Sequence, residues 1–363
     1  MLILAGHLDR RRFEPVAAVP AGTLAEELKQ LDVPVRSMPQ LRLSAPRNPW
    51  QVITAWICLR RWGAKLGTAA EEMDVDVVAA NSVTAALGCV SGPCRDLPIV
   101  WHARDLQAPR QATRRFVSTV TGISAISRCV ADALCDRHPA AREIARVIYN
   151  GIDPLQFRPE RSRSETREEF GIPPQARVIG SVGQLVPWKR QDLFIEAAAH
   201  LLVHLPGCYF LLVGADLFGE HSEYVSSLRD LSEGLGLQDR LIFAGYRQDI
   251  ASVMGAMDLL VHTAEEEPLG RVIIEAMILG IPCVAVNRCG PAEIIEDGRS
   301  GLLVPPGDPR AISTRVVELI GRQGAVERMG EAARRRAGEV FSAARMARLT
   351  EDLYEEALVE ARL

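Results

Sequence analysis

The chain lacks the cysteine spacings of a metal centre. Its eight cysteines include no C-x-x-C pair, and none of their spacings resembles a zinc site. Several of them lie inside apolar runs, which is typical of small buried side chains in a reducing compartment. We therefore expect free thiols and no bound metal.

A secretory signal peptide is also absent, and so is any apolar run long enough to span a bilayer. These absences predict a cytoplasmic protein. They leave open a peripheral contact of the first half of the chain with the inner face of the membrane.

A strong charge of either sign is missing as well. The net charge of −4 over 363 residues argues against a general nucleic-acid binder. The charge is uneven, because residues 1–155 carry a net +4 and the remainder a net −8. A mildly basic first half suits an anionic acceptor or a membrane surface, and an uneven surface composition explains it equally well.

The chain does contain a regular alternation of short β-rich runs with helical patterns, which predicts parallel, doubly wound α/β sheets. Its length favours two domains. We expect a first domain over 1–155, a linker rich in Pro, Arg, Glu and Ser over 156–176, a second domain over 177–341, and a long final helix over 342–363.

The stretch 265–286 (EEEPLGRVIIEAMILGIPCVAV) predicts an acidic loop, a helix and a buried strand. Glu267 lies in the loop and Glu275 in the second turn of the helix. Between them is a helix N-terminus, whose free N–H groups suit a phosphate, and Gly270 leaves the backbone there accessible. The pattern fits a sugar nucleotide held between two carboxylates, and a solvated acidic loop before an ordinary helix explains it equally well.

Other candidates follow from the rule that ligands of doubly wound sheets bind at the carboxyl ends of the strands. Lys189, in SVGQLVPWKRQD, is placed to neutralise a diphosphate leaving group, although a solvated helix start is the alternative. Gln184 in the same segment is polar but uncharged. A turn around Gly290 opens a further short helix, and His102 ends a strand of the first half. A lone histidine is more often structural than catalytic.

Three tryptophans, Trp50, Trp56 and Trp62, recur every six residues in a predicted long helix that also carries basic residues. The helix could face a membrane. Six-residue spacing scatters the rings around the helix, so we favour packing with one solvated face.

Taken together, these fragments resemble the family 4 retaining glycosyltransferases of the GT-B fold. EEEPLGRVIIEAM is similar to the family's E-P-F-G-x-x-x-x-E-A-M signature, with Leu269 in place of Phe. CGPAEIIEDGRSGLLVPPGDP and VGQLVPWKRQD are similar to its G-G-P-x-E…G-x-L-V-P-P-G-D and V-G-R-L-x-x-x-K-G-x-D segments. IVWHARDL, ISAISRCVADAL and RVIYNGID match landmarks of its acceptor domain. The resemblance extends from Leu8 to the end.

The resemblance implies two Rossmann-like domains facing a cleft, with the final helix crossing back to the first. It implies transfer of a sugar from a UDP- or GDP-sugar with retention and without a metal or other cofactor. Glu267 would contact donor-sugar hydroxyls, Glu275 the ribose, Lys189 the diphosphate and His102 the transferred sugar. The donor-binding set is Gly183, Gln184, Lys189, Arg247, Glu267, Leu269, Gly270, Glu275 and Gly290.

The chain departs from the family pattern in three places. Gln184 replaces an Arg, so neutralisation of the diphosphate leans on Lys189, and Arg190 replaces a Gly. The family also begins with a strand and a glycine-rich loop ahead of the helix that ends here at Leu8. Because that strand is central, its absence is expected to leave two neighbouring strands with unpaired backbone groups, and a fragment or a wrong start is the expected reason.

The expected function is therefore transfer of a sugar to a hydroxyl of a glycan, lipid or small-molecule acceptor, for example in polysaccharide biosynthesis. Two rivals stay open. One is a sugar-nucleotide epimerase or hydrolase of the same fold, which would consume donor without an acceptor. The other is a non-catalytic sugar-nucleotide-binding protein.

Overall fold

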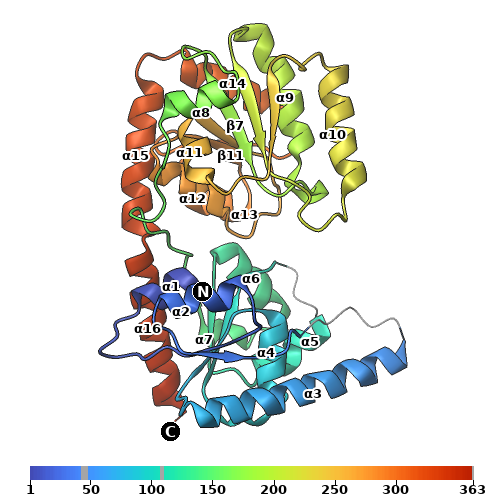
Figure 1. Cartoon of the computed structure of the whole chain (residues 1–363), viewed down its shortest axis with the longest axis vertical. Helices are drawn as coiled ribbons and strands as arrows, with labels where there is room; N and C mark the ends of the chain where they lie inside the picture. Colours follow the sequence, from blue (N-terminus) through green and yellow to red (C-terminus); the bar gives the residue numbers. More distant parts are fainter. Residues whose placement is uncertain (42–47, 107–109, 362–363) are drawn as a thin grey trace. The chain divides into compact units, whose positions relative to one another are not determined.

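The computed structural model describes residues 1–41, 48–106 and 110–361, and they form two compact units. Unit 1 comprises Met1–Gly151 and Ala343–Leu363, and unit 2 comprises Ile152–Ser342. All paired strands of both units run parallel. The predicted parallel α/β architecture in two units is therefore confirmed (Figure 1).

Unit 1 alternates strands and helices in the order that the sequence predicts. Its elements are α1 Leu2–His7, β1 Ala17–Val19, α2 Thr23–Gln30, β2 Val35–Ser37, α3 Pro49–Glu72, β3 Val78–Ala80, α4 Val83–Val90, η1 Pro93–Asp96, β4 Ile99–Ala103, α5 Arg110–Val117, β5 Gly122–Ala125, α6 Arg128–Arg137, α7 Ala141–Ile144, β6 Ala145–Val147 and α16 Ala343–Glu360. The final helix packs on β4 and β5 through Leu353, Tyr354 and Ala357. Residues 362–363 of the predicted final helix lie outside the described residues.

The strands of unit 1 form two separate sheets, β1-β2 and β3-β4-β5-β6. The N–H of Ala17 donates to Pro34 beside β2, and that of Val78 to Pro98 beside β4. Because successive residues of a strand point their backbone groups to opposite sides, those of Ala18 and Ala79 face the other way. Both residues line a cavity of about 850 Å³. The resemblance predicts two neighbouring strands with open edges, and β1 and β3 have them.

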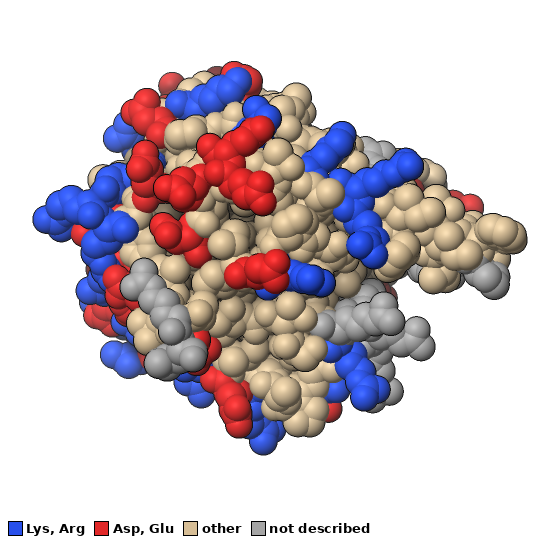
Figure 2. Space-filling view, turned by 90° about the horizontal axis from the view of Figure 1, so that it is seen from below, with Lys and Arg blue, Asp and Glu red and all other residues tan. Residues whose placement is uncertain are grey.

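Helix α3 is 24 residues long, and only its second half is anchored on the rest of unit 1. Gly63 lies against the backbone of Gly88, where an added Cβ would be 2.6 Å from the carbonyl oxygen. Leu66 and Ala69 are buried nearby. The first half extends away from the sheet (Figure 1), and the projecting end is largely free of charged side chains (Figure 2).

Unit 2 is built on one six-stranded sheet with the order β12-β11-β10-β7-β8-β9. Its elements are α8 Arg163–Glu169, β7 Val178–Val182, η2 Pro187–Lys189, α9 Gln191–His204, β8 Tyr209–Val213, α10 Ser222–Gly234, β9 Leu241–Gly245, α11 Ile250–Gly255, β10 Leu259–His262, α12 Arg271–Ile278, β11 Cys283–Val286, α13 Cys289–Ile294, β12 Leu302–Val304, α14 Pro309–Ile320 and α15 Ala325–Val340. Continuous apolar runs such as YFLLV make strands that are buried on both faces, and α9, α10 and α14 share one core with them.

The segment 156–176 differs from the linker that its composition predicts, because it folds as part of unit 2. It contains α8, which begins with a capping box formed by Ser162 and Glu165. Arg167 of α8 is buried and donates to the carboxylate of Asp258 at 2.9 Å. The arginines that suggested a solvated linker thus anchor it to the start of β10.

The thiols agree only in part with the expectation of small buried side chains. Five free cysteines, Cys89, Cys94, Cys135, Cys208 and Cys283, are buried. Cys58 is free and exposed, because it lies on the projecting half of α3.

Candidate functional site

The candidate site lies at the carboxyl ends of β7 and β10, two neighbouring strands in the middle of the unit 2 sheet. In a parallel sheet, the loops that follow neighbouring strands emerge at the same edge. The turn after β7 carries Lys189, and the loop after β10 carries Glu267. Distant segments of the chain are brought together in this way.

Lys189 and Glu267 form an ion pair through Nζ and Oε2, and both side chains are largely buried. Nε2 of His262, the last residue of β10, lies 3.2 Å from the same carboxylate oxygen without making a hydrogen bond. The ammonium of Lys189 also sits over the ring of Trp188, 4.2 Å from its centroid. Thr263 Oγ1 donates to the carbonyl of Lys189 at 2.9 Å and fixes the turn. A cation and a carboxylate are thus held side by side at the sheet edge.

The protonation states follow from these contacts. Burial opposes the ionisation of Glu267, but the contacts with His262 and Lys189 prevail and lower its pKa to about 2. Burial lowers the pKa of His262 despite the nearby carboxylate, so we assign a neutral imidazole at neutral pH. The cluster therefore presents one carboxylate, one ammonium group and one neutral ring.

The loop that carries Glu267 continues into the N-terminus of α12 through Gly270, whose φ is 95°. That left-handed conformation favours glycine. Gly290 of α13 donates its N–H to the carbonyl of Glu267 at 3.0 Å, and a Cβ on it would lie 2.3 Å from Cα of Leu269. Leu269 itself is buried. Two glycines thus let the backbone pack closely around the start of a helix, where N–H groups point outward.

Glu275 lies one and a half turns into α12 and is also buried. Its Oε1 accepts a hydrogen bond from Nε of Arg271 at 2.8 Å, an (i, i+4) pair. Burial raises the pKa of Glu275, and Arg271 acts in the opposite direction. Glu275 is therefore more readily protonated than Glu267, although both lie on the same loop and helix.

The turn after β7 places Gly183 and Gln184 at the same edge. The N–H of Gly183 donates to Val213, and its carbonyl oxygen would be 1.8 Å from a Cβ on Gly214. Gln184 contributes its carbonyl, which accepts from Nε2 of Gln191 at 2.8 Å. Gln184 thus places a neutral amide where the family pattern has an arginine. It lies beside the tight turn at Gly183.

Arg247 does not join this group, although we predicted it as a donor-binding residue. It follows β9, the edge strand, and β7 and β8 separate it from β10. Its guanidinium is bound by Asp249 at 2.8 Å and by Glu169 of α8 at 2.6 Å, which raises its pKa. Its contacts join the start of α11 to α8.

His102 of unit 1 is also placed differently from the prediction. The strand β4 is buried along its whole length, and the imidazole points to α16, where Nε2 lies 3.0 Å from the hydroxyl oxygen of Tyr354. Burial, and then the charge of Arg104, lower the pKa of His102 to about 3. A strand-end position predicted an open side chain, but α16 covers this one.

Two residues of the site, His262 and Arg271, were not predicted from the sequence. His262 ends its strand as His102 does, so the strand-end rule could have found it. Arg271 stands four residues before Glu275, the spacing of a helical ion pair. In the part of the chain that the structure describes, no group of three or more His, Cys, Asp or Glu side chains could hold a metal ion.

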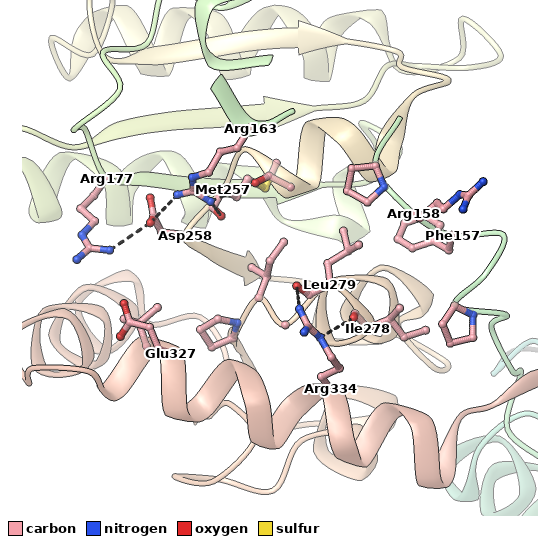
Figure 3. Close-up of a pocket in the computed structure, with 17 residues that line it drawn as sticks. Phe157, Arg158, Arg163, Arg177, Met257, Asp258, Ile278, Leu279, Glu327 and Arg334 are labelled. Atoms are coloured by element: carbon pink, nitrogen blue, oxygen red, sulfur yellow. Dashed lines mark hydrogen bonds and ion pairs between the residues drawn. The ribbon is translucent and has the colours of Figure 1, made fainter. Parts of the chain in front are cut away.

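A pocket of about 650 Å³ lies at the other edge of the unit 2 sheet, at the amino ends of β7, β10 and β11 (Figure 3). Asp258 accepts there from Arg163 at 2.7 Å and from Arg177 at 3.1 Å. Arg334 donates to the carbonyls of Ile278 and Leu279 at the end of α12. None of the predicted donor residues lines this pocket, so we treat its contacts as structural.

Family models match both halves of the chain. Residues 1–155 match the model described as Glycosyltransferase Family 4, and residues 162–336 match the model described as Glycosyl transferases group 1.

Curated relatives are identical to this chain at about a quarter to a third of the aligned positions. A D-inositol 3-phosphate glycosyltransferase of Mycobacteroides abscessus is 30% identical over 272 residues, which are 74% of this chain and 56% of the relative. Spore coat protein SA of Bacillus subtilis is 27% identical over 252 residues, 66% of each chain. The chain thus spans between half and two thirds of the length of these relatives.

Solved structures with the same fold cover nearly the whole chain. HepE of Anabaena in complex with UDP is 28% identical and has a TM-score of 0.81, covering 97% of this chain and 94% of that one. Its complex with UDP-glucose has a TM-score of 0.79 at 27% identity, covering 100% and 95%. A glycosyltransferase of Rickettsia africae, at 21% identity and a TM-score of 0.82 over 98% and 93% of the two chains, shares the fold.

Proposed function

Because the chain belongs to glycosyltransferase family 4, we propose that it transfers a sugar from a nucleoside diphosphate sugar to a hydroxyl, with retention at the anomeric carbon. A UDP-sugar is the favoured donor, since the solved relative from Anabaena holds UDP and UDP-glucose. A GDP-sugar is the alternative. The acceptor is a hydroxyl of a glycan, a lipid or a small molecule.

The observation that carries this proposal is the pairing of Lys189 with Glu267 beside the N-terminus of α12. A sugar nucleotide brings a diphosphate and a hydroxyl-rich ring, which need a cation with N–H donors and a carboxylate acceptor respectively. The ion pair offers the cation and the carboxylate side by side. The glycine-lined start of α12 offers the N–H groups.

In the proposed reaction, the bond between the anomeric carbon and the diphosphate oxygen breaks, and negative charge develops on the diphosphate. Lys189 and the N–H groups at Gly270 stabilise that charge. The acceptor oxygen bonds to the anomeric carbon on the face that the diphosphate leaves, and its proton passes to a diphosphate oxygen. Glu267 orients the sugar through its hydroxyls and Glu275 binds the ribose. No protein nucleophile takes part.

We also propose that transfer needs no metal, because Lys189 supplies the positive charge for the leaving group. Activity in excess EDTA that equals activity with added Mg²⁺ or Mn²⁺ supports this part of the proposal. A loss in EDTA that Mg²⁺ restores contradicts it.

The experiment is a donor panel with chromatographic detection of the released nucleotide. UDP-glucose, other UDP-sugars and GDP-sugars are each incubated with and without glycan, lipid-linked and small-molecule acceptors. The proposal expects nucleotide release that depends on an acceptor and that disappears in Lys189→Met. Donor consumption without an acceptor points to the epimerase or hydrolase instead. The matched control is Lys29→Met, at an exposed lysine of unit 1.

The open edges of β1 and β3 favour a second candidate, a protein that binds a sugar nucleotide without turning it over. This candidate needs only the proposed donor residues of unit 2, and the strands of unit 1 are divided between two sheets. This candidate expects UDP to raise the melting temperature while every donor and acceptor pair fails to react.

We further propose a cytoplasmic role in polysaccharide biosynthesis. A peripheral contact with the inner face of the membrane belongs to the same proposal, since it would bring the site to lipid-linked acceptors.

A further inference from the structure

The projecting half of α3 exposes large apolar side chains that a folded domain usually buries. Trp50 is 77% exposed, Trp56 50% and Ile53 49%, and Val52 and Ile57 are exposed as well. These five side chains are the apolar face of α3. Trp62, half a helix further on, instead donates its Nε1–H to the carbonyl of Pro39 and packs over Gly88. The sequence favoured packing for all three tryptophans, and the structure packs one of them.

The apolar face is continuous around the helix. At about 100° per residue, the order Val52, Trp56, Ile53, Ile57 and Trp50 spans roughly 160°. Thr54 and Gln51 lie on the remaining side, together with Ala55, Cys58 and Leu59. A helix that exposes a broad apolar arc and is anchored at one end only is suited to lie along a surface.

Positive charge lies at one end of the apolar face, towards the anchored half of α3. Arg60 stacks on Trp56, with its Cζ 4.8 Å from the ring centroid, and Arg61 and Lys65 follow on the next turn. The sequence 33–70 contains six Arg or Lys and no Asp or Glu. The first acidic side chain after it, Glu71, lies near the anchored end of the helix.

In the described part of the chain, no helix is both long enough and apolar enough to cross a bilayer. Indole rings favour the boundary between headgroups and acyl chains, and arginines beside them reach back to lipid phosphates.

We propose that the apolar face of α3 docks on the surface of a bilayer that contains anionic phospholipids. Trp50, Ile53 and Trp56 enter the interface, and Arg60, Arg61 and Lys65 bind the headgroup phosphates. The excess of positive charge selects a lipid surface over an apolar groove of another protein, which has no reason to require it. The proposal deepens the peripheral contact proposed above and names the element that makes it.

The test is sedimentation of the full chain with vesicles of phosphatidylcholine alone or with roughly one third phosphatidylglycerol. We expect binding to the anionic vesicles, weak binding to the neutral ones, and release as the salt concentration rises to about 0.5 M. Arg60→Gln with Arg61→Gln is expected to weaken binding about 25-fold, because each basic residue near an anionic surface contributes about fivefold.

The apolar part is tested by Trp50→Ser with Trp56→Ser. Its matched control is Val203→Ser with Phe218→Ser, which removes two apolar side chains of unit 2 that are 77% and 76% exposed. We expect the tryptophan variant to lose vesicle binding and the control to keep it. All four positions are at least half exposed, so both variants are expected to fold, and circular dichroism checks this.

Three outcomes overturn the proposal. The first is that the wild type binds neither vesicle, and the second is that the tryptophan variant binds as the wild type does. The third is a dimer in sedimentation velocity that the tryptophan variant abolishes while vesicle binding is absent, since the face then meets a second copy. UDP binding, measured on the same variants without vesicles, tests the donor site separately and is expected to be unchanged.

Discussion

Lys189 and Glu267 stand 78 residues apart in the chain, yet the ammonium of one is bound to the carboxylate of the other. They meet because β7 and β10, which precede them, are hydrogen-bonded neighbours in the sheet. Each charge compensates the other in a largely buried place. A diphosphate that binds Lys189 must therefore compete with Glu267, and the two side chains are expected to respond differently to mutation.

Removing the charge of Glu267 is expected to separate binding from transfer. Glu267→Gln leaves Lys189 without a competing carboxylate, so the affinity for UDP stays equal or rises. Transfer falls about 100-fold or more, because the sugar loses its orienting acceptor. Lys189→Met is expected to weaken UDP binding and to abolish transfer. Calorimetry with UDP and the release assay measure the two effects.

Glu220→Gln, at an exposed loop residue of unit 2, is the control for Glu267→Gln. If Glu267→Gln binds UDP far more weakly than the wild type and keeps its turnover, the assigned role of Glu267 is wrong. The double variant is expected to lose no more activity than Lys189→Met alone, because the two residues act together.

The Arg271–Glu275 pair is expected to make donor binding depend on pH. Burial raises the pKa of Glu275 and Arg271 opposes that rise. In Arg271→Ala the pKa rises further, so the carboxylate that we propose for ribose binding is protonated over a wider pH range. We expect the variant to lose more UDP affinity at pH 6 than at pH 8, measured by calorimetry. Arg299→Ala, at an exposed arginine, is expected to change neither value.

His102 is expected to make the stability of unit 1 sensitive to acid. Its pKa is lowered from 6.5 to about 3 by burial, so the unfolded chain takes up a proton that the folded unit excludes. Stability is therefore complete above about pH 6.5 and falls progressively as the pH drops towards 3. At pH 5 the loss is about 2 kcal/mol. Urea unfolding at pH 7.5 and 5 measures it.

The control for this effect is His102→Phe, which keeps the ring in the space beneath α16 and cannot be protonated. Its stability at pH 7.5 is expected to be lower, since the hydroxyl of Tyr354 loses its partner. The difference between pH 7.5 and pH 5 is expected to shrink by about 2 kcal/mol. An unchanged difference contradicts the assignment.

Asp258 is expected to be critical for the stability of unit 2. Its carboxylate accepts from Arg163 and Arg177 (Figure 3). It also accepts from Arg167 and from the backbone of Val178. Asp258→Asn leaves three guanidinium groups without their counter-charge, and we expect a loss of about 3 kcal/mol in the free energy of unfolding. Asp230→Asn, on the exposed side of α10, is the control and is expected to stay within about 0.5 kcal/mol of the wild type.

The sequence predicted the candidate site best where strand order alone determines the geometry. Glu267, Lys189 and Gly290 all follow strands of one parallel sheet, so the rule on carboxyl ends places them at the same edge. Glu275 followed from helical spacing. The partners of these residues were harder to see, because the choice of His262 or Arg271 as a contact depends on side-chain directions within the packed edge.

The failures have a common physical cause. His102, Arg247 and the segment 156–176 were each judged by local chemistry, and each is determined by a distant partner. Tyr354 covers His102, Glu169 binds Arg247, and Asp258 binds Arg167. None of these contacts has a periodic or short-range signal. The prediction for the exposed half of α3 failed in the opposite way. Packing was expected for Trp50 and Trp56, but both side chains are exposed.

The return of α16 to unit 1 has a consequence for synthesis on the ribosome. Val100 and Ile148 share their core with Leu353 and Tyr354, so unit 1 lacks part of its interior until the last segment of the chain has been made. Unit 2, which is continuous from Ile152 to Ser342, is complete earlier. Domains generally fold as units in the order in which they are synthesised. Here the order is reversed, and the first half of the nascent chain waits for its closing helix while the second half is already folded.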